Sequence, residues 1–429
     1  MSKVARWKVA GAALLLLSGV LQAQLRHSEG SAFPSYEGRV MAGYQAWFRA
    51  PGDGSGRGWV HWGAHGQFSE ASACTVDFWP DVSEYSQTYE TDFRLVDGSA
   101  ARVFSSYDFS TVDTHFRWMR EYAIDGVFLQ RFFPTAAGRA VDADPDKVVR
   151  NVVQAAEKHG RAFAIMYDLS GLRPGQDDCD TLIEDWKRLV DELRLTSRGE
   201  DQTYLYHRGG PLVAIWGVGF PDRSYDIREI RLEAFIDFLK NDPEYGGCSV
   251  MLGVPTYFRE LHTDSVADPY LHRLIESADI VMPWMVLRFS SVLHAEVQRY
   301  HTHILQDRAW CEQRGLDYVP VVYPGMSWYN LSIFENRPHQ QLNAIPRVQG
   351  HHYWMLIDTA INSGARMLYA AMFDEVDEGT AIFKCTDDVP VSNRWKFATF
   401  EGTGSDYYLR LTGLAAESLR QRLQSVPAP

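Results

Sequence analysis

The amino-acid sequence predicts an α/β fold, a (β/α)8 barrel with long loops on the C-terminal face of its strands. Eight short apolar segments alternate along the chain with segments of helical periodicity, which is typical of parallel strands joined by crossover helices. The apolar segments are hydrophobic throughout rather than at every second residue, as expected of a parallel sheet covered on both faces. Eight such units are the number that closes a barrel.

The expected strands recur from residue 39 to residue 373. They are Arg39–Phe48, Asp125–Phe132, Ala162–Gly171, Pro211–Phe220, Cys248–Pro255, Asp279–Val286, Tyr318–Gly325 and Ala365–Phe373. A doubly wound open sheet is the competing architecture, but it usually has fewer strands and a recognisable nucleotide-binding loop. The Gly-rich segment after the first strand has neither of the glycine patterns that cradle phosphates.

Helical periodicity fills the intervals between these strands. The expected helices are Thr111–Tyr122, Pro145–His159, Thr181–Leu195, Arg228–Lys240, Pro269–Ser277, Val292–Arg314 and Gln349–Ser363. Asn330–Arg347 is expected to be a long loop between the seventh strand and its helix. After Phe383 the chain ends in a segment that is expected to close the barrel as an eighth helix or a small cap.

The N-terminus predicts export. Lys3, Arg6 and Lys8 precede an apolar run from Val9 to about Leu21, the layout of a secretory signal covering residues 1–23. The run is short for a stable membrane span, although an N-terminal anchor helix is the alternative. We therefore expect a periplasmic or extracellular protein in which residues 24–429 form one domain; its oligomeric state is left open.

The composition of the chain excludes some classes of function. The formal net charge of -13 excludes a nucleic-acid groove, which needs a basic stripe to collect phosphates. The five cysteines, Cys74, Cys179, Cys248, Cys311 and Cys385, show no metal-binding spacing, so neither a metal nor another cofactor is expected. Their pairing is open, although Cys248 lies in an apolar run and fits a buried small side chain.

The residues at the strand ends indicate a carbohydrate site, because the active sites of such barrels lie at the C-terminal ends of the strands. These ends carry aromatic rings, amides and carboxylates, and sugars present apolar faces for stacking and hydroxyls for hydrogen bonds. Other strand-end residues include Gln45, Gln130, Arg131 and Trp216. The candidates for contacts with an oligosaccharide or polysaccharide are Tyr44, Trp47, Asp168, Trp284 and Tyr323.

The last strand ends in four carboxylates: Asp374, Glu375, Asp377 and Glu378. Glycosidic cleavage needs two carboxyl groups in different protonation states, and crowding in a partly dry cleft raises one pKa while the other group stays ionised. The alternative is that these residues cap the next helix. For the two aspartates, helix capping is as strong an interpretation as catalysis. For the two glutamates, helix capping is the weaker interpretation.

The run E-V-D-E-G-T from Glu375 to Thr380 resembles a motif of the glycoside hydrolase family 71/99-like proteins. It is closest in pattern to family 99, the endo-α-mannosidases, which typically carry E-W-H-E-G-T at the end of the last barrel strand. Val376 and Asp377 replace the Trp and His of that motif. The aromatic first strand and the Y-P-G of Tyr323 to Gly325 also fit, so the resemblance spans about Arg39 to Phe383.

The resemblance implies a retaining glycoside hydrolase that cleaves an α-linked glycan, such as an α-mannan. The cleaved bond would lie within the glycan rather than at its end. In the family the first Glu assists the sugar 2-hydroxyl through a 1,2-anhydro sugar, and the second is general acid and then base; these positions are Glu375 and Glu378. Alternatives are an α-1,3-glucanase of the family 71 type, a xylosidase-like exo-enzyme, and a carbohydrate-binding barrel without catalysis.

Overall fold

The computed structural model describes residues 25–425 apart from Ala140 and His339. The expected signal segment, residues 1–23, lies outside the described residues. Within the described part of the chain, no helix is both long enough and apolar enough to cross a membrane.

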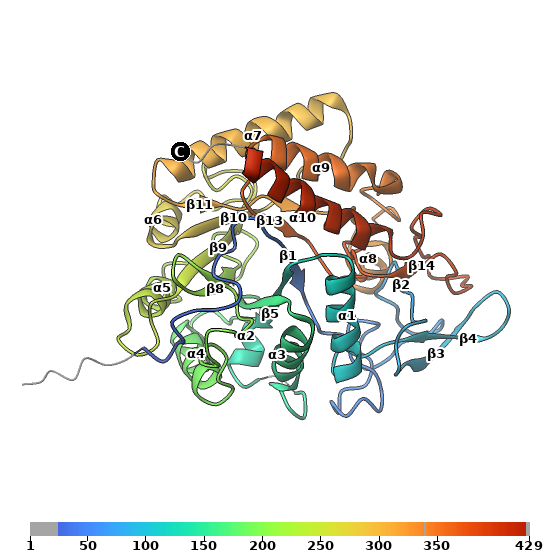
Figure 1. Cartoon of the computed structure of the whole chain (residues 1–429). Coiled ribbons are helices and arrows are strands. Elements are labelled where there is room, and N and C mark those ends of the chain that lie inside the picture. The colour runs from blue at the N-terminus through green and yellow to red at the C-terminus, as the bar shows by residue number, and fades with distance from the viewer. Residues whose placement is uncertain (1–24, 140, 339, 426–429) are drawn as a thin grey trace, which may run out of the picture.

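Eight parallel strands form a closed ring (Figure 1). They are β1 (Val40–Tyr44), β5 (Gly126–Phe132), β6 (Ala162–Asp168), β8 (Gly210–Trp216), β9 (Ser249–Pro255), β10 (Ile280–Trp284), β11 (Asp317–Tyr318) continued by β12 (Val321–Val322), and β13 (Leu368–Ala370). β11 pairs with β10 and β12 pairs with β13, so the seventh strand closes the ring. Pro320, which has no N–H to donate, lies in its interruption. The predicted barrel and its eight strands are confirmed.

In the part of the chain that the structure describes, eight helices of at least two turns are present. They lie around the outside of the strands (Figure 1). They are α1 (Phe109–Glu121), α3 (Lys147–His159), α4 (Asp180–Asp191), α5 (Leu232–Asn241), α6 (Tyr270–Ser277), α7 (His294–Glu312), α9 (His351–Asn362) and α10 (Tyr407–Ser425). In α3, for example, Val149, Val152, Val153 and Ala156 are buried, which is the spacing of one helix face. The seven predicted helices are present, and α10 is the expected closing helix.

Several shorter elements are additional to the predicted set. They are β2 (Trp79–Pro80) paired with β14 (Cys385–Thr386), the hairpin of β3 (Tyr89–Arg94) and β4 (Ala100–Val103), β7 (Tyr206–His207), α2 (Phe133–Ala136), α8 (Tyr329–Phe334) and the 3-10 turn η1 (Val348–Gly350). The hairpin projects at the right of Figure 1. The expected loop Asn330–Arg347 is wrong at its start, because α8 occupies residues up to Phe334.

The interior of the barrel is filled by side chains from alternate strand positions. Tyr369 of β13 packs against Phe128 of β5 and Trp284 of β10, with ring centroids 5.7 and 6.3 Å apart. Gly43 of β1 faces the same layer: a Cβ there would lie 2.2 Å from the Tyr369 hydroxyl and from Sδ of Met372. The five cysteines are unpaired and buried in the described structure, and Cys248 is among them as expected.

Candidate active site

Asp374 joins the end of β13 to the end of β1. Its two carboxylate oxygens accept hydrogen bonds from the backbone N–H groups of Gln45, at 2.9 Å, and Ala46, at 2.8 Å. Burial raises the pKa of Asp374 to about 7, against the lowering effect of the two N–H donors. Because these donors belong to a strand end rather than to a helix, Asp374 is a clamp between strands and not a helix cap.

Glu375 is held at both oxygens. The Gln45 side-chain amide donates to Oε1 at 2.7 Å, and the Thr380 hydroxyl donates to Oε2 at 2.6 Å. Burial, with the nearby Asp377 as a second cause, raises the pKa of Glu375 to about 8, while the two donors lower it. Hydrogen bonds of this kind favour the ionised carboxylate, because each donor stabilises negative charge on the oxygen that it contacts.

Glu378 has different surroundings. Its side chain is partly exposed, whereas Glu375 and Asp377 are buried. Burial of its carboxyl group and the neighbouring Glu375 raise the pKa of Glu378 well above its usual range, and the Trp328 indole partly opposes the rise. Its backbone carbonyl accepts a hydrogen bond from the Ser327 N–H at 3.0 Å, which anchors it to the loop after β12. Glu378 therefore keeps its proton more readily than a carboxyl group in water.

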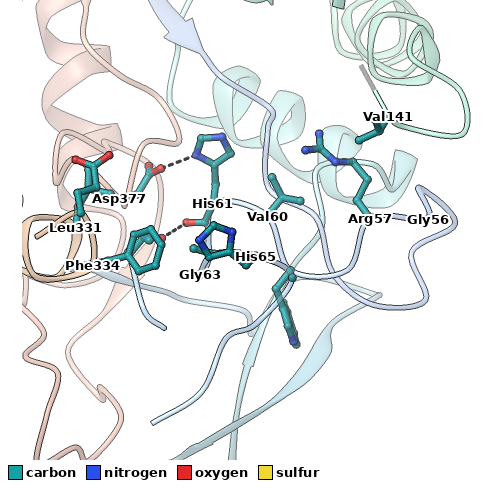
Figure 2. A pocket seen from close by; sticks show the side chains of 15 residues that line it. Gly56, Arg57, Val60, His61, Gly63, His65, Val141, Leu331, Phe334 and Asp377 are labelled. Carbon is teal, nitrogen blue, oxygen red and sulfur yellow. Dashed lines mark hydrogen bonds and ion pairs between the residues drawn. The ribbon is translucent and has the colours of Figure 1, made fainter. Parts of the chain in front are cut away.

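Asp377 pairs with His61, which comes from the Gly-rich loop after β1. Their Oδ2 and Nδ1 atoms are 2.9 Å apart (Figure 2). The His61 backbone has a φ of 62°, a left-handed conformation that is uncommon outside glycine. Burial, followed by the charges of Arg49 and Arg57, lowers the pKa of His61 to about 3, and burial raises that of Asp377. Both shifts favour a neutral pair in which the Asp377 carboxyl donates its proton to His61.

Aromatic side chains surround this segment on the C-terminal face. The His61 ring lies flat on Trp47, with centroids 3.7 Å apart and an interplanar angle of 5°, and Trp47 stacks in turn on Phe132 at 5.5 Å. At the ends of β8 and β10, the rings of Trp216 and Trp284 meet edge to face at 5.5 Å. These rings are half-buried, and aromatic rings at the mouth of a barrel are suited to packing against the apolar faces of sugars.

Polar atoms without a protein partner lie on the same face. Gln45, Gln130, Trp47 and Trp216 each have a buried polar side-chain atom that makes no hydrogen bond to another described residue. Buried polar atoms are normally paired, so unpaired ones at a cleft are available to ligand hydroxyls. Next to them, at the end of β6, Asp168 accepts a hydrogen bond from the Ser170 N–H at 2.8 Å, and burial raises its pKa.

Two of the predicted contact residues lie in the core instead. Tyr44 is completely buried, and its hydroxyl is 2.8 Å from Nδ1 of His115 in α1. Tyr323 is also completely buried, and its hydroxyl donates to the Phe289 carbonyl at 2.7 Å. Both hydroxyl groups are therefore bonded within the protein, and neither side chain is exposed at the cleft. The other predicted residues, Trp47, Asp168, Trp284, Glu375 and Glu378, lie at the C-terminal ends of the strands.

Arg131, another strand-end residue, is structural. It is buried and pairs with Asp185 of α4 at 2.6 Å and with Asp146 at 3.1 Å. His61 is the residue that sequence reasoning missed. It stands in a Gly-rich loop more than 300 positions before Asp377, and no local pattern marks the pairing.

Two cavities adjoin the His61–Asp377 pair. One, of about 540 Å³, is lined by Asp377, Phe334 and Glu335 (Figure 2). The other, of about 450 Å³, is lined by Gln45, Trp47 and Gln130. His61, Arg57, Val60 and Val141 line both, so the Gly-rich loop forms the wall between the cavities.

No family model and no curated protein matches this chain. Among solved structures, it is similar to the family 99 endo-α-mannosidase of Bacteroides thetaiotaomicron, with a TM-score of 0.64 and 16% identity over 91% of this chain and 99% of that one. A second structure of that enzyme, in complex with Bis-Tris-propane, has a TM-score of 0.61 and 14% identity over the same shares. The chain therefore has a glycoside hydrolase family 99-like (β/α)8 fold, as the motif at Glu375 indicates.

Proposed function

We propose that this protein is a glycoside hydrolase that cleaves an α-linked glycan with retention, using Glu375 and Glu378. The observation that carries the proposal is the contrast between the two glutamates at the end of the last barrel strand. Burial raises the pKa of both groups, but Glu375 accepts two hydrogen bonds that oppose the rise and favour its carboxylate form, whereas the neighbouring Glu375 raises the pKa of Glu378 further. Carboxyl groups with opposed environments are the usual acid–base assignment of a glycosidase.

The roles follow from these states. The Glu375 carboxylate removes the proton from the sugar 2-hydroxyl, whose oxygen attacks the anomeric carbon. Glu378 protonates the departing glycosidic oxygen, and a 1,2-anhydro sugar forms. Glu378, now ionised, takes a proton from the water that opens this intermediate, and Glu375 returns its proton to the 2-oxygen. Two displacements at the anomeric carbon retain its configuration.

An endo-acting α-mannanase is the form of this activity that we favour. The structural relative is an endo-α-mannosidase, and the cavities on either side of His61 offer room for sugar units in two directions. We further propose that the protein is exported through residues 1–23. The α-1,3-glucanase and xylosidase-like alternatives differ in substrate and not in the proposed use of the glutamates.

The test is product analysis on α-mannan, α-1,3-glucan and xylan with the chain from residue 24 onward. We expect Glu375→Gln and Glu378→Gln each to reduce the rate by about 100-fold or more while the fold is retained. Glu417→Gln, at an exposed position of α10, is the matched control and should keep full activity. NMR of the first product should show the anomer of the substrate. Binding without turnover on every glycan, or equal rates in the two Gln variants and wild type, would refute the proposal.

A further inference from the structure

The cavity between the ends of β1 and β5 is rich in arginine although the chain as a whole is acidic. The net charge of the chain is -13, yet this cavity of about 450 Å³ is lined by four arginines and by one acidic residue, Asp142. The arginines are Arg49, Arg57, Arg131 and Arg139. Whether they offer charge to a ligand depends on how far nearby carboxylates neutralise each of them.

The charge of Arg57 is only partly neutralised. Asp142 is held at both oxygens by Arg49, at 2.9 and 3.4 Å, so its charge is already matched. Arg57 approaches the same carboxylate only at 3.6 Å, and its guanidinium makes no hydrogen bond to another described residue. Figure 2 shows Arg57 and Val141 on the side of His61 away from Asp377. Two arginines thus share one carboxylate at the cavity wall.

Arg139 repeats this arrangement on the other side of the cavity. Its partner Asp177 accepts a hydrogen bond from Arg139 at 2.9 Å and two from Arg173, both at 3.0 Å. Again two guanidinium groups share one carboxylate. Nε of Arg139 is buried and has no partner among the described residues. An N–H donor of this kind beside a cavity is available to an acceptor on a ligand. Arg131, by contrast, is matched by Asp185 and Asp146.

The cavity is also connected to the proposed reaction centre. Gln45 lines it and donates to Oε1 of Glu375 at 2.7 Å, so one side chain links the cavity wall to Glu375. Trp47 and Gln130 in its wall each keep an unpaired polar atom. Burial is the first cause of the lowered pKa of His61, and the charges of Arg49 and Arg57 lower it further.

We propose that this cavity is a subsite for a sugar unit that carries an anionic substituent, a carboxylate, a sulfate or a phosphate ester. Guanidinium groups have the planar donor geometry that matches such oxyanions, and Arg57 and Arg139 each share their carboxylate partner with a second arginine. That the anion is part of a glycan rests on the proposed function; that the ligand is anionic rests on the arginines.

The test is an NMR titration of the wild-type chain with methyl α-mannoside, its 6-sulfate, its 6-phosphate and the corresponding uronate. We expect at least one anionic sugar to bind roughly tenfold or more tightly than the neutral one, with an affinity that falls as NaCl is raised. Arg57→Gln and Arg139→Gln should abolish this preference, because each should weaken binding of the anionic sugar more than binding of the neutral one. Arg228→Gln, which removes an exposed arginine paired with Asp268, is the control and should keep the preference.

Equal affinity for neutral and anionic sugars in the wild type, or a preference that survives both arginine substitutions, would overturn the subsite. Inorganic sulfate that binds as tightly as the sugar sulfate would overturn its assignment to a glycan. The proposed function can fail separately. A preference for anionic sugars without turnover of any glycan would support the subsite and refute the hydrolase activity. Turnover of a neutral mannan without a preference for anionic sugars would support the hydrolase activity and refute the subsite.

Discussion

At the scale of single residues, Asp377 is the group on which the protonation of both glutamates depends. It is a cause of the raised pKa of Asp374, Glu375 and Glu378 alike. Its own proton is directed at His61, so the negative charge that Asp377 places beside the glutamates grows as this proton is lost. His61 therefore acts as a positioning residue, because it works through Asp377 and not on the substrate.

The prediction for His61→Ala follows from this role. Without its partner, Asp377 faces the cavity and ionises more easily, and the added negative charge raises the pKa of Glu375 further. Since Glu375 must be ionised to act as a base, the acidic limb of the kcat/KM profile should move to higher pH, with activity near neutral pH reduced by roughly tenfold.

The double variant His61→Ala/Asp377→Asn separates this effect from lost packing. A neutral amide at position 377 cannot ionise, so the pH profile should return toward that of wild type even though the Trp47 ring stays uncovered. A profile that is unchanged in His61→Ala, or one that the second substitution does not restore, would contradict the electrostatic role. The pH dependence of kcat/KM is the measurement.

At the scale of elements, the strands were predictable because each is a continuous apolar run between helical segments. β5 and β6, for instance, are buried along almost their whole length. The hairpin was harder to recognise, because β3 reads YETDFR and buries only Thr91 and Phe93. β3 pairs with β4 outside the barrel. Both strands are short and only partly buried, so neither their length nor their apolarity distinguishes them from a loop.

The same periodicity explains which site residues could be predicted. Gly43 and Gln45 face the interior of the barrel, so Tyr44 between them must face outward, and its hydroxyl accordingly meets His115. Tyr44 was expected at the site because it is an aromatic residue at a strand end, but the alternation along β1 directs its side chain toward α1. Glu375 and Glu378 were predicted from their place after the last apolar run and from the E-V-D-E-G-T motif, and their catalytic role stays a prediction. No spacing rule links His61 to Asp377, which come together only through the fold.

β1 offers a direct test of the packing in the barrel. A Cβ at Gly43 would lie 2.2 Å from two side-chain atoms of the interior layer, so Gly43→Ala should lower the free energy of unfolding by roughly 1–3 kcal/mol. At Gly30, an added Cβ has no neighbour nearer than 3.7 Å, and Gly30→Ala should leave stability nearly unchanged. Urea unfolding of both variants gives the comparison, and an equal effect at the two positions would contradict the interior packing.

At the scale of the whole molecule, the proton-binding groups of the site set how stability depends on pH. The pKa of Asp374 is raised to about 7 and that of Glu375 to about 8, so the folded chain binds these protons more tightly than the unfolded chain does. Their contribution to stability is fully present below the ordinary carboxyl pKa, near 4, and is lost as the pH rises through about 7 to 8. Glu84 has the opposite sign, because its pKa is lowered to about 2, and it contributes stability that is lost only in strong acid.

The protein should therefore melt at a lower temperature at pH 9 than at pH 6, with each titrating group of the site contributing on the order of 1 kcal/mol or more. Repulsion among the negative charges of this acidic protein also grows as the pH rises. Asp377→Asn isolates the contribution of the site carboxyl groups to the pH dependence of stability. It removes one proton-binding group and lowers the pKa of Glu375, so its melting temperature should change less between the two pH values than that of wild type. Glu417→Gln removes one surface charge and should follow wild type. Calorimetry at fixed ionic strength decides the matter: parallel curves for Asp377→Asn and wild type would mean that the carboxyl cluster does not govern stability in this range.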